Sequence, residues 1–445
     1  MAQPEPVPRQ RRHRTLPPPP EWLREHTLVP EAGASGLPDE VGFALFVALR
    51  DLKSCADALP EERPALLGPP SAERQKATAA AAEQEGEIAG ALETISTLRI
   101  SPETVTPAQL GAACREIHGW ADERGLTQTA LLFAEAGARV DAENSTLASA
   151  AGRAARRAAL LERADLWYER GVALAARYNK RGELIRALIG RGALMREQAR
   201  FREAKRLLER AASLAAATRR YRQAAEVQHE LLIIAAEAGG YAEAERHMRA
   251  ALRHYPIHHP SLLGLIHDWC FVLVRYALYE QALPLLDAVL PQIQRPEVQT
   301  AAWGILARAA AGAGRRDRYY GARDRVLSHT ESGQEFITTA LANIAEGARL
   351  LGEWEFGTEL ATRAVEIARA RNNTEAEQFA LKILAGLSAQ APPPPQAVPS
   401  AGNHLEAISR RIAYYLQARQ RPARRPVQLD GDRVADRRQN RPSAR

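Results

Sequence analysis

The sequence of 445 residues contains few cysteine, aromatic and lysine residues. Its three cysteines, Cys55, Cys114 and Cys270, are odd in number, lie far apart and form no C-x-x-C pair. That pattern argues against a disulfide framework and against a zinc finger. Aromatic residues make up only 6% of the chain, which is low for a sheet core. The composition therefore favours an all-α fold in which helices pack through small side chains.

Lysine is scarce, since arginine makes up all but 5 of the 60 basic residues. Since this bias affects the whole chain, arginine alone is weak evidence for any function. The net charge of +7 comes from the two ends. Residues 403–445 carry +7, residues 1–20 carry +3, and the remainder carries −3. A basic tail can attract nucleic acid or acidic surfaces, but it can equally be a solubilising disordered end.

Long apolar runs are also lacking. No stretch of 18 apolar residues occurs, and residues 1–20 are rich in Arg and Pro without the apolar core of a signal peptide. These features predict a cytoplasmic protein that does not enter a membrane.

Motifs that carry common enzyme chemistry are missing from the sequence. There is no phosphate-binding loop, dinucleotide-binding glycine pattern or serine-hydrolase elbow. His229 and Glu230 begin like a zinc-protease motif, but position 233 is Ile instead of His. We therefore expect a protein that is not an enzyme and that binds neither a cofactor nor a metal.

Proline and charge divide the chain into segments. Two helices are expected near the N-terminus, over residues 39–59 and 71–98, from the spacing of apolar residues. Pro392 to Pro395 mark a linker after a long region with little proline. The predicted organisation is a disordered N-terminus at 1–20, a helical region at 21–102, a helical repeat array at 103–389, a Pro-rich linker at 390–402, a helix at 403–420 and a basic disordered tail at 421–445.

The array contains an internal repeat. An aromatic residue, two further residues and a small residue recur at Phe201–Ala204, Tyr241–Ala244, Tyr279–Ala282 and Trp354–Gly357. In three of these units another small residue follows seven positions later, and in three a large apolar residue follows after four. Small residues at such places let two antiparallel helices approach closely.

This spacing resembles the tetratricopeptide repeat, a helix–turn–helix unit with small residues at two facing positions. The first small residue of each second helix recurs at steps of 33 to 41 residues, which is similar to the extended repeats of bacterial regulators and motor light chains. The resemblance covers about two thirds of the chain. It implies a right-handed superhelical solenoid of about seven helix pairs that acts as a protein-interaction scaffold.

Such solenoids bind partners in a concave groove lined by the first helix of each pair. Arginine predominates among the groove positions that the resemblance implies, and guanidinium groups suit carboxylates. The expected partner is therefore an acidic protein or peptide segment, although the same residues are also typical of solvated helix faces in an arginine-rich chain. The candidate groove residues are Arg153, Arg156, Arg163, Arg186, Arg196, Glu226, His229, His267, Arg275, Glu346 and Arg349.

Two further interpretations remain open from the sequence. The histidines between His254 and His267, together with Cys270, could suggest a metal site, but Pro256 and Pro260 interrupt the stretch, so loop histidines and a core cysteine are the simpler interpretation. The second hypothesis about function is a nucleic-acid-associated regulator that uses the Arg-rich tail for phosphate contacts.

Overall fold

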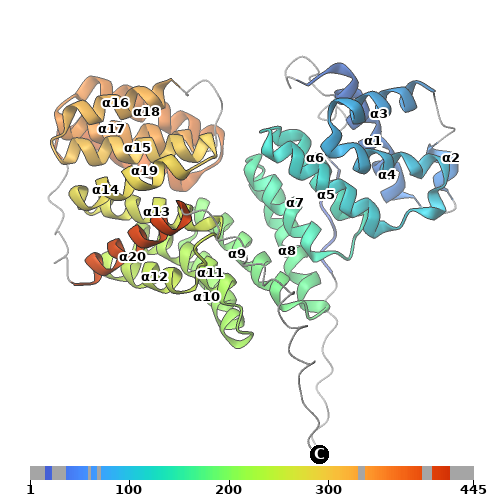
Figure 1. The fold of residues 1–445 in the computed structure, drawn as a ribbon, viewed down its shortest axis with the longest axis horizontal. Helices are drawn as coiled ribbons and strands as arrows, with labels where there is room; N and C mark the ends of the chain where they lie inside the picture. The colour runs from blue at the N-terminus through green and yellow to red at the C-terminus, as the bar shows by residue number, and fades with distance from the viewer. Residues whose placement is uncertain are drawn as a thin grey trace, which may run out of the picture.

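A computed structural model describes residues 16–22, 37–58, 62–67, 72–328, 336–392 and 403–420. Within these ranges the protein is all-helical, and consecutive helices pack against one another. Figure 1 shows α1–α4 at one end of the molecule and α15–α19 at the other, with α9 between them. The expected tail at 421–445, residues 1–15 and most of the expected linker at 390–402 lie outside the described residues.

The N-terminal helical region consists of four helices. They are α1 (Asp39–Asp57), α2 (Arg63–Leu67), α3 (Ala72–Gln84) and α4 (Ala89–Ile100). The single helix expected over 71–98 is therefore two helices, because the chain turns at Glu85 (φ −125°, ψ 69°). The Glu85 carboxylate accepts a hydrogen bond from Trp120 Nε1 at 3.1 Å. The break lets α3 and α4 pack both on each other and on α1.

The remaining helices up to residue 388 pack as successive neighbours along the chain. Their bounds are α5 (Pro107–Glu123), α6 (Thr127–Val140), α7 (Ser145–Arg157), α8 (Leu161–Arg177), α9 (Arg181–Glu197), α10 (Phe201–Ala217), α11 (Tyr221–Ile234), α12 (Tyr241–His254), α13 (Ser261–Arg275), α14 (Tyr279–Val289), α15 (Pro296–Gly312), α16 (Arg316–Leu327), α17 (Ile337–Leu351), α18 (Trp354–Ala370) and α19 (Thr374–Ser388).

Six turns in the described part of this run share one geometry around a residue that is not glycine. The φ values of these residues lie between 52° and 60°, at Ala159, Asn179, Ala199, Arg219, Ala277 and Asn372. The residue after each donates its N–H to a carbonyl five positions back, as Arg200 does to Met195 at 2.8 Å. This is the bond that closes a Schellman motif. The helices between four successive turns of this kind, α8, α9 and α10, are 17 residues long each.

Small residues lie where the helices approach most closely. Ala204, Ala244 and Ala282 from the repeated pattern are fully buried. A Cβ atom added to Gly171 would lie 2.7 Å from Ser149 Oγ, so Gly171 of α8 faces α7 closely. The small residues therefore lie on the buried, helix-facing side of their helices.

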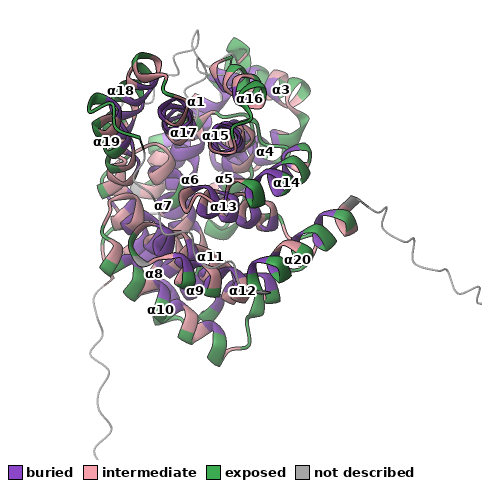
Figure 2. Cartoon of the chain, turned by 90° about the vertical axis from the view of Figure 1, so that its left-hand side faces the viewer, coloured by how far each residue is buried: buried purple, intermediate pink, exposed green. Residues whose placement is uncertain are grey.

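The last helix, α20 (Asn403–Gln420), packs against α14. Figure 2 shows its buried stripe turned toward the molecule and its exposed face turned outward. Tyr415 Oη donates to Leu252 O at 3.1 Å, and Arg419 Nη1 donates to Ile257 O at 2.7 Å. Part of the basic C-terminal region is therefore structural. The buried residues of α20 are Leu405, Ile408, Ile412, Tyr415 and Leu416.

Residues 16–22 form an extended strap that lies against α6 and α8. Residues 16–20 of the strap belong to the segment 1–20 that was expected to be disordered or polyproline-like. The strap is held by hydrogen bonds to its backbone carbonyls: Arg170 Nη1 donates to Pro17 O at 2.5 Å, and Arg163 Nη2 donates to Glu21 O at 2.6 Å.

None of the helices in the described part of the chain has both the length and the apolar character needed to cross a membrane.

Candidate functional site

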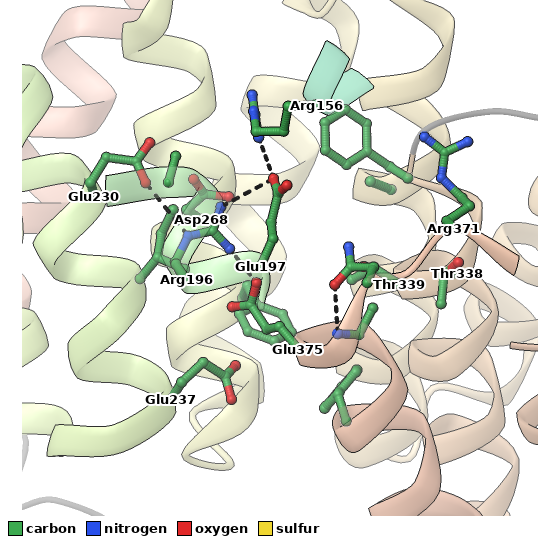
Figure 3. Close-up of a pocket in the computed structure, with 18 of the residues that line it drawn as sticks. Arg156, Arg196, Glu197, Glu230, Glu237, Asp268, Thr338, Thr339, Arg371 and Glu375 are labelled. Carbon is green, nitrogen blue, oxygen red and sulfur yellow. Dashed lines mark hydrogen bonds and ion pairs between the residues drawn. The ribbon is translucent and has the colours of Figure 1, made fainter. Parts of the chain in front are cut away.

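The principal candidate site is a cavity of about 330 Å³, here called the central cavity, which Figure 3 shows from close by. It lies between α7, α9, α11, α13, α15 and α17, and α19 borders it on the remaining side. Its charged lining residues are Arg156, Arg196, Glu197, Glu230, Glu237, His267, Asp268, Arg371 and Glu375.

Arg196, in the last turn of α9, is the centre of the charged lining. It forms an ion pair with Glu375, and its guanidinium also lies 3.5 Å from Glu230 and 3.9 Å from Glu197. Burial alone would lower the pKa of Arg196, but the carboxylates of Glu375, Glu230 and Glu197 raise it above its ordinary value. Arg196 therefore stays charged, and its positive charge is shared among three carboxylates.

Glu375 reaches the cavity from the first turn of α19. The side chain of Asn373 caps this helix by accepting a hydrogen bond from the N–H of Ala376 at 3.0 Å. Burial raises the pKa of Glu375 to about 7, with Arg196 opposing the rise and the nearby acidic side chains adding to it. The surroundings of Glu375 thus favour its protonated form more than water does.

Asp268 on α13 accepts hydrogen bonds from two histidines. His229 Nε2 lies 2.7 Å from Asp268 Oδ2, and His267 Nδ1 lies 2.8 Å from Oδ1. Burial opposes ionisation of Asp268, but the two histidine hydrogen bonds lower its pKa well below the usual range. Burial alone would lower the pKa of His229, but the hydrogen bond and charge of Asp268, together with the charge of Glu230, raise it above its ordinary value. The three side chains form a fixed polar unit between α11 and α13.

The cavity also has an apolar part. Phe271 of α13 and Phe379 of α19 meet edge to face with ring centroids 5.7 Å apart. Phe336 and Ile305 complete this side of the lining. The cavity therefore combines a charged side with an aromatic side.

The structure brings together only some of the candidate groove residues. Arg156, Arg196 and His267 line the central cavity. His229 and Arg275 lie behind it, paired with the cavity carboxylates Asp268 and Glu237.

The other candidate groove residues lie elsewhere. Arg349 is 7% exposed and forms an ion pair with Glu346 at 3.2 Å. Arg153 and Arg186 are exposed and do not line the cavity. Arg163 binds Glu135 and the strap, and Glu226 lies 3.8 Å from His259.

Sequence reasoning missed the carboxylates of the cavity. Glu230 and Glu237 lie seven residues apart on α11 and its continuation, so a helical projection places them on one face. Glu197 follows Arg196 directly. No local signal could have indicated Glu375, because α19 lies after the last helix pair of the predicted array and meets α9 only in the folded protein.

Among the described residues, no group of three or more His, Cys, Asp and Glu side chains is placed to hold a metal ion. His254 stacks on Tyr221 with ring centroids 5.4 Å apart. Cys270 is fully buried in the core, where burial raises the pKa of its thiol. These residues therefore contribute to packing between repeats.

Comparison with known proteins finds no protein-family model and no curated protein sequence that matches this chain.

Proposed function

We propose that this protein is a non-enzymatic interaction scaffold, built as a tetratricopeptide-like right-handed superhelix, and that its central cavity binds a segment of a partner protein. The observation that carries the proposal is that every odd-numbered helix from α7 to α17 contributes to one cavity. A surface made from one helix of each pair is the surface that helical solenoids use for binding.

The charges of the cavity favour a basic group on the partner. The lining contains three arginines and five carboxylates, and Arg156 and Arg196 already form ion pairs with Glu197 and Glu375. An acidic segment would have to displace these carboxylates, whereas a basic side chain would add to them. The acidic partner expected from the sequence therefore has less support in the cavity than a basic one.

Two buried polar atoms of the lining make no hydrogen bond within the described part of the chain. They are His267 Nε2 and Glu230 Oε2, and the latter lies 3.5 Å from Arg196 Nε in an ion pair. The aromatic side formed by Phe271 and Phe379 suits the apolar stem of a lysine or arginine side chain. We therefore propose that the partner inserts a basic side chain between α11 and α19.

Binding of the full-length protein to short extended peptides that carry either Lys and Arg or Asp and Glu tests this proposal. Basic peptides should bind, and Glu230→Gln should weaken binding by about tenfold or more, because a charge-assisted hydrogen bond contributes about 1.5–3 kcal/mol. Glu209→Gln, at an exposed position of α10, is the matched control. A preference for acidic peptides that is lost in Arg186→Ala would instead place the site on the exposed arginines.

The alternative is a nucleic-acid-associated regulator that uses its basic C-terminal end. Because α20 packs on the helical body, only residues 421–445 should be removed to test it. Phosphate binding should weaken steeply as salt increases and should disappear with this deletion. Nucleic-acid binding that survives the deletion would exclude the tail as the binding element.

A further inference from the structure

The strap defines a second surface, distinct from the central cavity. Its contacts come from α6 and α8, whereas the cavity is lined mainly by odd-numbered helices, with Leu161 at the start of α8 also in its lining. Arg139 of α6 donates to Pro20 O, and its guanidinium lies 4.3 Å from the ring centroid of Trp22. Arg163 and Arg170 of α8 donate to the carbonyls of Glu21 and Pro17. We call the surface formed by Arg139, Arg163 and Arg170 the strap groove.

The chemistry of the groove matches a proline run. Residues 16–22 read Leu-Pro-Pro-Pro-Pro-Glu-Trp, and prolines have no N–H but keep their carbonyl acceptors. Arginine side chains only donate, so three guanidinium groups complement a row of free carbonyls. The ends of the strap add apolar anchors, since Leu16 and Trp22 pack against two hydrophobic clusters of the body.

Two arginines of the groove, Arg163 and Arg170, also form hydrogen bonds with the helices around them. Arg163 Nη2 donates to Glu135 Oε2 at 2.6 Å, and Glu135 is 1% exposed and also accepts from Trp167 Nε1 at 2.9 Å. Arg170 is 7% exposed, and its Nη2 donates to Ala142 O at 2.8 Å. Because these contacts do not involve the strap, Arg163 and Arg170 are positioned before any extended segment binds.

We propose that the strap groove is a docking site for proline-rich segments with an apolar residue before the prolines and an aromatic residue after them, and that the strap is its intramolecular occupant. A partner segment of this kind would bind by replacing the strap. Fourteen residues, 23–36, connect the strap to the segment that leads into α1, so the strap stays tethered beside the groove and competes with any partner.

The test uses a labelled peptide with the sequence of residues 14–24. The receptor is the full-length protein in which residues 16–22 are replaced by Gly and Ser, and fluorescence anisotropy measures binding. The vacated groove should bind the peptide saturably, and the unchanged protein should bind it at least tenfold more weakly because its own strap occupies the groove. A peptide with its four prolines changed to alanine should bind the vacated groove at least tenfold more weakly, because it loses its preformed extended conformation.

Variants of the vacated protein locate the peptide. Arg139→Gln should weaken binding by about tenfold, since it removes a donor to a carbonyl and the cation–π contact, whereas the exposed Arg153→Gln should not change it. The proposal is overturned if the folded, vacated protein does not bind the peptide. It is also overturned if the unchanged protein binds equally well or if Arg139→Gln has no effect.

A second variant covers the case in which replacing the strap prevents folding. Trp22→Ala in the full-length protein removes one anchor of the strap and keeps every other residue. Peptide affinity should then increase severalfold relative to the unchanged protein. An unchanged affinity in Trp22→Ala would contradict the competition between strap and peptide.

Discussion

Arg196 and Glu375 lie 179 residues apart in the sequence and form an ion pair that joins α9 to α19. A second link supports this closure, because Arg371 Nη2 donates to the carbonyl of Arg157 at 3.2 Å. The end of the helical array therefore returns to its early part and borders the central cavity. A change in this ion pair should therefore affect both the folding stability of the protein and the charges of the cavity.

Arg196→Met should destabilise the protein by about 3 kcal/mol or more, because it leaves several buried carboxylates without their shared cation. Glu375→Gln should cost much less, since Glu230 and Glu197 still neutralise Arg196. Equilibrium unfolding in urea measures both changes. An equal loss of unfolding free energy in the two variants would show that Arg196 does not stabilise the carboxylates other than Glu375.

The raised pKa of Glu375 predicts a pH dependence of stability. Its folded-state pKa of about 7 lies above the ordinary value of 4.5, so the folded state favours the protonated form. Stability from this group is present below about pH 4.5 and is lost as the pH rises through about 7. Unfolding free energies from pH 5 to pH 8 should therefore fall in the unchanged protein relative to Glu375→Gln. A constant difference over that range would mean that Glu375 titrates normally.

The shared turn predicts that glycine stabilises a surface position. Arg219 has φ 53°, which costs an L-residue about 1 kcal/mol, so Arg219→Gly should stabilise the protein by about 0.5–1 kcal/mol. Arg206→Gly, the same exchange at an exposed position within α10, should instead destabilise it by a similar amount. Thermal unfolding of the two variants should shift in opposite directions.

Ala244 is expected to tolerate no larger side chain. It is fully buried on α12, and Ala244→Leu should cost about 1–3 kcal/mol through overpacking. Ala216→Leu, at an exposed position of α10, should leave the melting temperature nearly unchanged. A similar effect of both changes would indicate that Ala244 does not lie at a close helix contact.

The packing of α20 predicts the C-terminal end of the protease-resistant part of the protein. Limited proteolysis should preserve residues 403–420 as part of the resistant body, since Ile408, Ile412 and Leu416 are buried. Deletion of 421–445 should leave the melting temperature unchanged, whereas deletion of 403–445 should lower it by exposing the apolar surface that α20 covers. Cleavage before residue 403 without loss of stability would contradict this.

The sequence alone determined the helical class and much of the helix spacing, because these depend on local features. The aromatic and small residues from Phe201 to Ala204 and from Tyr241 to Ala244 recur at one side of each helix, and a side chain's position on a helix follows from its spacing. Asn144 and Asn373 cap α7 and α19 within three residues of their own positions. Such local signals can be recognised without knowing which segment packs against the helix.

The tertiary structure decided the chemistry of the cavity and the position of the strap. Arg196 was expected to be a groove residue, but nothing in the sequence indicated its ion-pair partner Glu375, which lies 179 residues later. Periodicity shows which face of a helix is buried and does not show which other segment covers that face. For the same reason, the prolines at the N-terminus indicated only a disordered or polyproline-like segment, whereas the folded structure places Arg139 and Arg170 at carbonyls of residues 16–22.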